Sequence, residues 1–347
     1  MTMTPPLSNV RIIEFEGLGP APLAARMLAD MGATVTAITR PGRSAVSAQL
    51  GGSDADPFHR GKEVVILDLK QPEAVARALD LVAAADVLIE GNRPGVMERL
   101  GLGPTACASR NPRLVYARMT GWGQTGPLSA AAGHDLNYVA LTGVLSLSAH
   151  RGERPIIPPA VVGDAGGALG MAFGIVCAVL EARSSGRGRV VDAAIVDVMA
   201  MMAGIALFAR AGGQLGGSEP SPFHDSPFYD VYECADGKFV TLGALEPQFY
   251  RLLLEKLGLT DVSPARQYDK AGWPALKARV AALFRSREQA HWCALLEGTD
   301  VCFAPVLTLD EARRHRHIAS RNLYQATPGG AFDSVAAPRF LPLVDGA

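Results

Sequence analysis

The stretch NVRIIEFEGLGPAPLAARMLADMGATVTAITR, residues 9–40, decides the fold. Residues 9–17 are rich in apolar and β-branched side chains, as is typical of a strand. Residues 21–32 carry apolar side chains at helical spacing, and residues 33–40 return to strand character. A strand, a helix and a second strand joined by so short a turn predict a βαβ unit.

The same alternation continues along the chain. Strands are predicted over residues 63–70, 86–92 and 112–121, and helices over 71–85, 94–101 and 104–110. Parallel strands need helical crossovers, so this order predicts an α/β fold with a mostly parallel, Rossmann-like sheet and covered faces. We expect residues 165–210, rich in Ala, Gly and Met, to be helical.

A Gly/Pro/Ser-rich break at residues 212–227 introduces a smaller α+β region. Residues 228–245 predict a hairpin that turns at Asp236-Gly237, and amphipathic helices are predicted over 246–259, 274–286 and 287–298. The resulting division is a large domain at 1–185, a helical connection and linker at 186–225, a small domain at 226–315, and a segment at 316–347 that returns to the large domain.

Composition disfavours several classes of function. The chain has 347 residues, 48% of them hydrophobic, which is ample for a large core. Its 33 basic and 34 acidic side chains give a net charge of -1 without a basic tract, so nucleic acid is not an expected partner. The five cysteines form no CxxC pair and no metal-ligand pattern, which indicates a reduced, cytoplasmic environment.

Two segments could in principle be targeting or membrane sequences. Residues 1–15 have neither the basic nor the apolar region of a secretory signal. Between Asp164 and Glu181 lie 16 uncharged residues, which is shorter than a membrane span. We therefore expect a buried core helix and no membrane span.

The glycines of the first turn invite comparison with a dinucleotide-binding motif. Gly17 and Gly19 are not followed by a third glycine at the G-x-G-x-x-G spacing. Pro20 and Pro22 occupy positions where backbone N–H groups would face a pyrophosphate, and proline has no such donor. The turn therefore disfavours binding of NAD.

Three residues could carry acid–base chemistry, and each has a structural alternative. Asp164 precedes an apolar helix and suits an N-cap, but Gly163, Gly166 and Gly167 would also let a ligand approach the helix start, where N–H groups stabilise an oxyanion. His134 is either a structural histidine or a general base. Glu246, before Pro247, is either a helix cap or a catalytic carboxylate.

Basic residues follow the strands of the α/β region. Arg40, Arg60, Lys62 and Arg93 fall in or near strand-end loops, where open parallel sheets bind ligands, and together they suit a ligand with several phosphates. His315 and His317 resemble a metal-binding pair, but no third ligand lies at useful spacing, so a solvated helix end is expected and no metal site is predicted.

With these residues in view, the sequence resembles the family III CoA-transferase superfamily (CaiB/BaiF type), and within it the α-methylacyl-CoA racemase branch. The similarity extends from about residue 7 to about residue 320. The segments that carry it are LSNVRIIEFEGLGPAPLAARMLADMGATV, RGKEVVILDLK, NRPGVMERLGLGP, TGWGQTGP, GHDLNYVALTGVLS, GDAGGALGMAFGIVCAVLEARSSGRGRVVDAAIVD and GALEPQF. Glu63 after RGK and Glu16 in EFEGLGP depart from the branch's pattern.

The resemblance implies an intertwined homodimer and an acyl-CoA substrate, with CoA as part of the thioester and no separate cofactor. It implies that His134, Asp164 and Glu246 are catalytic. The expected CoA and substrate contacts are Arg40, Arg60, Gly61, Lys62, Arg93, Gly133, Asp135, Leu136, Asn137 and Tyr138.

The reaction expected from this resemblance is inversion at the α-carbon of an acyl thioester. His134, oriented by Glu246 or Asp135, would serve one face of an enolate, and Asp164 the other. An N–H at the helix start near Asp164 would hold the enolate oxygen, and the Met-rich residues 198–208 either line the acyl path or simply pack the core. The alternatives are a CoA-transferase with Asp164 as nucleophile and an acyl-CoA-binding protein without activity.

Overall fold

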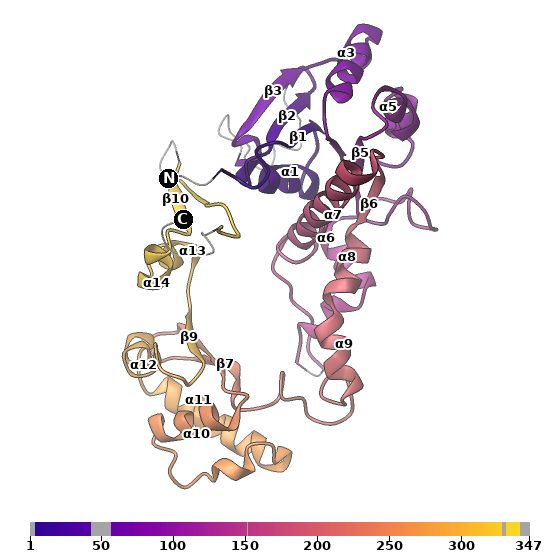
Figure 1. Cartoon of the computed structure of the whole chain (residues 1–347). Coiled ribbons are helices and arrows are strands. Elements are labelled where there is room, and N and C mark those ends of the chain that lie inside the picture. Colours follow the sequence, from indigo (N-terminus) through magenta and orange to yellow (C-terminus); the bar gives the residue numbers. More distant parts are fainter. Residues whose placement is uncertain (1–3, 43–56, 151, 328–330, 341–347) are drawn as a thin grey trace. The chain divides into compact units, whose positions relative to one another are not determined.

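The computed structural model describes residues 4–42, 57–150, 152–327 and 331–340, and the chain divides into two compact units (Figure 1). The first unit comprises Met1–Ser146, Ile157–Met202 and Tyr324–Ala347, and the second comprises Leu147–Ile156 and Ala203–Leu323. These boundaries differ from the predicted ones at two places. Residues 186–202 belong to the first unit instead of a connection, and residues 316–323 belong to the second unit instead of the returning segment.

The first unit contains a six-stranded parallel sheet in the order β3-β2-β1-β4-β5-β6, which confirms the predicted α/β class. Its strands are β1 (Arg11–Phe15), β2 (Thr34–Thr39), β3 (Lys62–Ile66), β4 (Val87–Glu90), β5 (Val115–Thr120) and β6 (Val190–Ala194). The prediction of continuous helix over 165–210 is wrong at β6. A short edge strand between two helices has no periodicity of its own that would reveal it.

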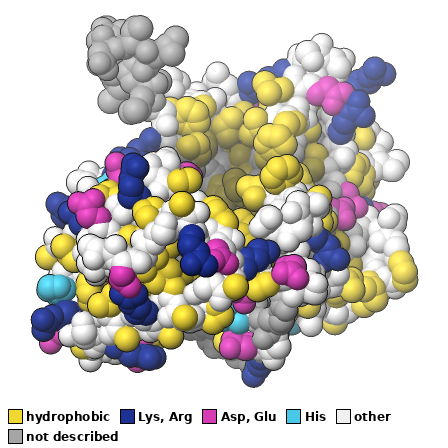
Figure 2. All heavy atoms as spheres, turned by 90° about the horizontal axis from the view of Figure 1, so that it is seen from below, with side chains coloured by type: hydrophobic (Ala, Val, Ile, Leu, Met, Phe, Trp, Pro, Cys, Tyr) yellow, Lys and Arg dark blue, Asp and Glu magenta, His cyan; other side chains and the backbone are white. Residues whose placement is uncertain are grey.

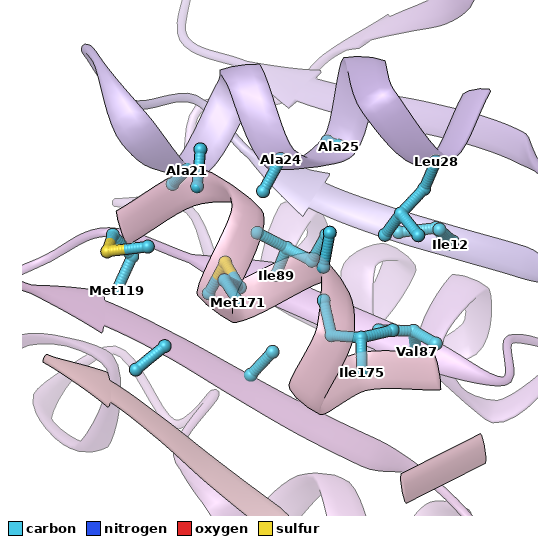
Figure 3. Packing of buried hydrophobic residues seen from close by; sticks show 14 of the residues in the cluster. Ile12, Ala21, Ala24, Ala25, Leu28, Val87, Ile89, Met119, Met171 and Ile175 are labelled. Atoms are coloured by element: carbon cyan, nitrogen blue, oxygen red, sulfur yellow. The ribbon is translucent and has the colours of Figure 1, made fainter. Parts of the chain in front are cut away.

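Helices cover both faces of this sheet. The alternation of side chains along β1 sends Ile12 toward α1 (Pro20–Asp30) and α7 (Gly163–Ser185), and Ile13 toward α3 (Pro72–Ala83) and α5 (Pro104–Arg110). Figure 3 shows the first of these layers, in which small alanines of α1 let it pack closely against α7. The labelled side chains are Ile12, Ala21, Ala24, Ala25, Leu28, Val87, Ile89, Met119, Met171 and Ile175.

The helix α7 is long and apolar enough to cross a membrane by length and composition alone, but half of its most apolar window is buried. Met171 and Ile175 lie in the core between the sheet and α1, as predicted for a core helix. On its other side, Leu169 and Phe173 are exposed. The first unit is completed by α4 (Val96–Arg99), α6 (Asp135–Leu141) and α8 (Ile195–Met202).

The second unit is built on a three-stranded antiparallel sheet of β7 (Tyr229–Glu233), β8 (Phe239–Gly243) and β9 (Phe303–Val306). The predicted hairpin is confirmed, with Gly237 at φ +72° in its turn. The predicted helices are present as α10 (Pro247–Lys256), α11 (Trp273–Arg285) and α12 (Gln289–Leu296). The strand β9 has only four residues and contains a proline, so its sequence does not predict a strand.

A C-terminal hairpin, β10 (Tyr324–Ala326) and β11 (Phe332–Ser334), belongs to the first unit. Asp333 joins it to that unit through two ion pairs, from Arg26 Nη2 to Oδ1 at 2.8 Å and from Arg60 Nη1 to Oδ2 at 2.6 Å. The second unit also contains α9 (Gly204–Ala211), α13 (Leu309–Ala312) and α14 (Arg316–Ser320).

Candidate active site

The predicted catalytic aspartate lies at the carboxyl edge of the parallel sheet. The strand order reverses between β1 and β4, and open parallel sheets bind ligands at such a switch point. Gly19 follows β1 with φ +75°, and a Cβ there would lie 3.0 Å from Asp164 Oδ2. Gly91 follows β4, where a Cβ would lie 3.2 Å from Ala21 Cβ. The turns after β1 and β4 therefore adjoin, with Asp164 beside the first.

Asp164 occupies the first turn of α7 and is partly buried. Its N–H donates to Asp135 Oδ1 at 2.6 Å. Burial, together with the Asp135 charge and against the His134 charge, raises the pKa of Asp164 to about 6. A carboxyl with this pKa exists in both protonation states near neutral pH, as an alternating acid and base requires.

His134 is the N-cap residue of α6, with an extended backbone at φ -134° and ψ 173°. Its N–H donates to Asn137 Oδ1 at 3.0 Å, so its backbone rather than its imidazole serves the helix start. The side chain is exposed and close enough to Asp164 to influence the titration of that carboxyl. The structure therefore brings His134 and Asp164 together, and neither is confined to a capping role.

An aromatic wall stands beside these two residues. The Tyr138 hydroxyl donates to the Gly133 carbonyl, and the Tyr138 and Trp122 rings meet edge-to-face with centroids 4.7 Å apart. A Cβ at Gly121 would overlap the Tyr138 ring at 1.9 Å, which explains glycine there. Burial and the Asp164 charge raise the pKa of Tyr138, and the Arg93 charge lowers it.

Trp122 was not predicted as a site residue. Its buried Nε1 has no hydrogen-bond partner in the described part of the chain. A pocket of about 490 Å³ is lined by Trp122, Ala132, Asn137, Ala140 and Leu141. The signal available in the sequence was a tryptophan within the Gly-rich turn TGWGQTGP.

The prediction that Gly163, Gly166 and Gly167 let a ligand approach α7 is wrong. Side chains of the first unit already fill the space beside them, and a Cβ at each glycine would come within 3 Å of its neighbour. These neighbours are Asp135, Met199 and Ile195, respectively.

An N–H at the helix start near Asp164 was expected to hold an enolate oxygen, and the N–H of Asp164 itself is engaged because it donates to Asp135. The first turn of α6 offers donors instead. Within the described residues, the N–H groups of Asp135 and Leu136 have no hydrogen-bond acceptor. Asp135 and Leu136 were predicted as substrate contacts, and these amides lie next to His134 in the chain.

Two of the predicted phosphate-binding cations are committed to carboxylates. The Lys62 side chain is fully buried, with Nζ 2.6 Å from Glu14 Oε2 and 2.9 Å from the Pro22 carbonyl. Arg60 pairs with Asp30 and Asp333. In this structure the charges of Lys62 and Arg60 are therefore paired with carboxylates of the same chain. Gly61, between them, has a left-handed backbone with φ +76°.

The other two predicted cations remain accessible. The Arg40 side chain is 64% exposed and pairs with Glu16, with Nε 3.1 Å from Oε2. Glu16, which departs from the pattern of the racemase branch, therefore has a defined partner. Arg93 is exposed in the loop after β4, and its carbonyl accepts a hydrogen bond from the Val96 N–H at 3.1 Å. The Arg93 guanidinium makes no hydrogen bond or ion pair with any described residue, so among the four predicted cations its side chain is the uncommitted one within the described part of the chain.

The third predicted catalytic residue, Glu246, lies in the second unit as the exposed N-cap of α10. Its charge adds to burial in raising the pKa of Tyr268 and of Cys302. A role of Glu246 toward His134 stays a prediction. His315, also in the second unit, pairs with Glu297 at 3.1 Å and precedes α14, and all five cysteines are free thiols.

This fold and site place the protein in a known class: the chain belongs to CoA-transferase family III, which matches residues 7–347. Among curated relatives, the alpha-methylacyl-CoA racemases of Mus musculus and Homo sapiens are 40% and 39% identical to it over 348 residues, covering 97% of this chain and 86% of each relative. The acetyl-CoA:oxalate CoA-transferase of Acetobacter aceti is 30% identical over 339 residues, covering 92% and 85%.

Solved structures agree with this assignment. The orthorhombic crystal form of Rv3272 from M. tuberculosis superposes with a TM-score of 0.80 at 27% identity, covering 97% of this chain and 93% of that one. A CAIB/BAIF family protein from Brucella suis has the same fold, with a TM-score of 0.81 at 23% identity and coverage of 97% and 93%.

Proposed function

We propose that the protein is an acyl-CoA racemase that interconverts (R)- and (S)-2-methylacyl-CoA thioesters. The observation that carries this proposal is the placement of exposed His134 near Asp164, whose pKa is raised to about 6, at the carboxyl edge of the parallel sheet. Similarity to two alpha-methylacyl-CoA racemases over almost the whole chain supports it.

The reaction begins with removal of the α-proton, which the thioester carbonyl acidifies. For one epimer, neutral His134 takes the proton from one face and protonated Asp164 delivers a proton to the other. For the opposite epimer, Asp164 is the base and protonated His134 is the acid. No electron leaves the substrate, so inversion requires proton transfer and charge stabilisation rather than a redox cofactor.

The enolate oxygen needs hydrogen-bond donors that are in place before the reaction. The N–H groups of Asp135 and Leu136 are such donors, since no described residue accepts from them. They lie next to His134 in the chain, at the positive end of α6. We assign the enolate oxygen to these amides instead of the occupied amide of Asp164.

The CoA part of the substrate is anionic and suits Arg93 and Arg40. Both guanidinium groups are exposed and follow strands of the parallel sheet, whereas Lys62 is buried with Glu14. The acyl part suits the Met-rich tract, because a Cβ at Gly166 would lie 3.1 Å from Met202 Sδ, and Gly166 is near Asp164 in α7. Methionine adapts to chains of different shape.

A homodimer is the assembly that the exposed apolar surface supports. No residue of α9 is buried within the chain, and Ile205 and Phe208 are 84% and 80% exposed. Apolar side chains also gather in broad patches on the face shown in Figure 2. Patches of this kind are typical of surfaces covered by a partner, and the family resemblance suggests an intertwined pair of identical chains.

A CoA-transferase is the second candidate, because Asp164 could attack the thioester and release CoA. Relatives such as the Acetobacter aceti enzyme carry a transferase name. His134 favours the racemase, since the transferase reaction needs a nucleophile and an acceptor but no base on the opposite face of the α-carbon.

Chiral chromatography of a single-epimer 2-methylacyl-CoA, incubated with the protein and no free carboxylate, separates the candidates. A racemase produces the opposite epimer to equilibrium, and hydroxylamine traps no enzyme adduct. Turnover only after a carboxylate is added, with a hydroxylamine-sensitive adduct at Asp164, would establish the transferase. Binding of the thioester with neither reaction would indicate a protein that only binds acyl-CoA.

A further inference from the structure

We propose that Arg118 is a positioning residue that fixes the loop carrying Arg93, and so sets the affinity of the site for CoA. This inference rests on the proposed function in assigning Arg93 to the CoA part of the substrate. The observation behind it is that one buried guanidinium binds carboxylates on both sides of this loop.

The first carboxylate is Glu90, the last residue of β4. Glu90 and Arg118 are register partners on neighbouring parallel strands, and Arg118 Nε lies 2.9 Å from Glu90 Oε1. The Glu90 side chain is 0% exposed and that of Arg118 is 8% exposed. The pair is therefore a fixed part of the sheet at the start of the loop.

The second carboxylate is Glu98, on α4 at the other end of the loop. Arg118 Nη1 lies 2.8 Å from Glu98 Oε1, and Nη2 lies 3.3 Å from Oε2, which is the two-point geometry that arginine favours. The stem of Glu98 reaches this position over Gly103, where a Cβ would lie 2.8 Å from Glu98 Cγ. Glu90 and Glu98 are thereby joined through a single side chain.

The loop between them is held at its backbone as well. The Asn92 N–H donates to Glu90 Oε2 at 2.7 Å, and Asn92 Nδ2 donates to Met97 Sδ at 3.4 Å. Arg93 follows Asn92, and its carbonyl accepts from the Val96 N–H at 3.1 Å. The Arg93 guanidinium makes no hydrogen bond or ion pair among the described residues, although its charge lowers the pKa of Tyr138. The position of Arg93 therefore depends on the anchoring of its loop.

Stability alone does not explain this network. Removing two carboxylates and a guanidinium from water is costly, and apolar residues of similar volume often serve a core equally well. The ionic groups instead fix a defined geometry, because the planar guanidinium of Arg118 binds both carboxylates at once. This geometry holds the start of the loop and α4 in one arrangement, with Arg93 near Tyr138.

Titration calorimetry with free coenzyme A tests this proposal independently of the reaction. Glu98→Ala removes the half-exposed partner and leaves the Glu90–Arg118 pair in place; Arg118→Lys keeps the charge and loses the fork. Arg93→Ala should raise Kd about tenfold, the expected cost of one charge-assisted contact, and each network variant should raise it by about threefold to tenfold. Saturated turnover should change less than twofold in both network variants.

The double variant Arg93→Ala/Glu98→Ala is decisive. If Glu98 acts through Arg93, the Kd of the double variant equals that of Arg93→Ala alone. A Kd raised by the product of the two single effects would show that the residues act independently and would overturn the proposal. An unchanged Kd in Arg93→Ala or in Glu98→Ala would also overturn it. Glu181→Ala, which removes an exposed two-point partner of Arg189, is the matched control and should leave Kd unchanged. A wild-type protein that binds coenzyme A without epimerising its thioesters would refute the proposed function but not this coupling.

Discussion

At the scale of single residues, the site depends on two side chains with different surroundings. Asp164 is partly buried beside Gly19 and Asp135, whereas the imidazole of His134 is exposed at the start of α6. Partial burial raises the pKa of Asp164 toward neutrality, so this carboxyl can exchange a proton with a weak carbon acid more readily than an ordinary surface aspartate. The chemistry therefore follows from where the fold places each group.

The pH profile should report this pKa. When Asp164 is the base it must be ionised, and its ionised fraction rises as pH passes about 6. Both directions use the enzyme form in which His134 and Asp164 share one proton, and the equilibrium between the epimers does not depend on pH. The kcat/KM should therefore follow the same profile from either epimer and decrease as protonation of Asp164 below about pH 6 removes that form. Initial epimerisation rates from each pure epimer between pH 4.5 and pH 8 measure the profile, and a profile without an inflection near pH 6 would contradict the assignment.

Gly19 provides a second residue-scale prediction. Gly19→Ala forces a positive φ on alanine and brings a Cβ to 3.0 Å from Asp164 Oδ2. We expect a loss of about 1–3 kcal/mol in the free energy of unfolding and at least a tenfold fall in kcat. Gly186→Ala, at the far end of α7, imposes a similar φ with nothing within 4 Å, so it should lose stability but retain activity. Equal activity of the two variants would rule out the contact with Asp164.

At the scale of elements, the sequence predicted those helices and strands that are long enough to show apolar periodicity. The strands and helix of residues 9–40 were found because apolar spacing distinguishes β1, α1 and β2, whereas β6 and β9 are too short to show it. Pro20 and Pro22 do lie in the first turn of α1, where they remove N–H donors.

Ion pairs between distant residues lay beyond such reasoning. Lys62 and Arg60 were predicted to bind phosphate, whereas in the structure they pair with Glu14 and Asp333. These partners lie 48 and 273 residues away along the chain, so no local pattern reveals the pairing. The catalytic candidates were identified by resemblance, since capping and catalysis use the same residue types at a helix start. Only the fold decides which cations remain free and which amides lack an acceptor.

The C-terminal hairpin allows an element-scale test. Asp333→Ala leaves the Arg26 side chain, 7% exposed, without this partner, and should cost about 2–4 kcal/mol in the free energy of unfolding. Chemical denaturation followed by circular dichroism measures the loss. Asp310→Ala removes a partner from the exposed Arg313 pair and should cost under about 1 kcal/mol. Similar losses in the two variants would show that the hairpin is not anchored by Asp333.

At the scale of the whole molecule, α9 is an apolar helix without a buried residue in its own chain. A monomer would expose Ile205 and Phe208 to water, which a second chain would prevent. The family model matches residues 7–347, a range that includes α9.

Phe208→Glu should therefore shift the protein from dimer to monomer, because a charge replaces apolar area at the proposed interface. Sedimentation velocity at micromolar concentration reads the change directly. Arg210→Glu, on the same helix, alters charge without removing apolar area and should disturb the dimer less. A wild-type protein that sediments as a monomer would contradict the proposed assembly.

The central claim is that His134 and Asp164 invert the α-carbon of an acyl-CoA. It is tested most directly by proton NMR of one pure 2-methylacyl-CoA epimer in D₂O, with wild-type protein and with His134→Ala, and His317→Ala as an exposed-histidine control. Wild type and His317→Ala should convert the substrate to the opposite epimer carrying deuterium at the α-carbon, whereas His134→Ala should do so about 10²- to 10⁴-fold more slowly. Retention of the α-proton by wild type, or full activity of His134→Ala, would contradict this role of His134 and Asp164.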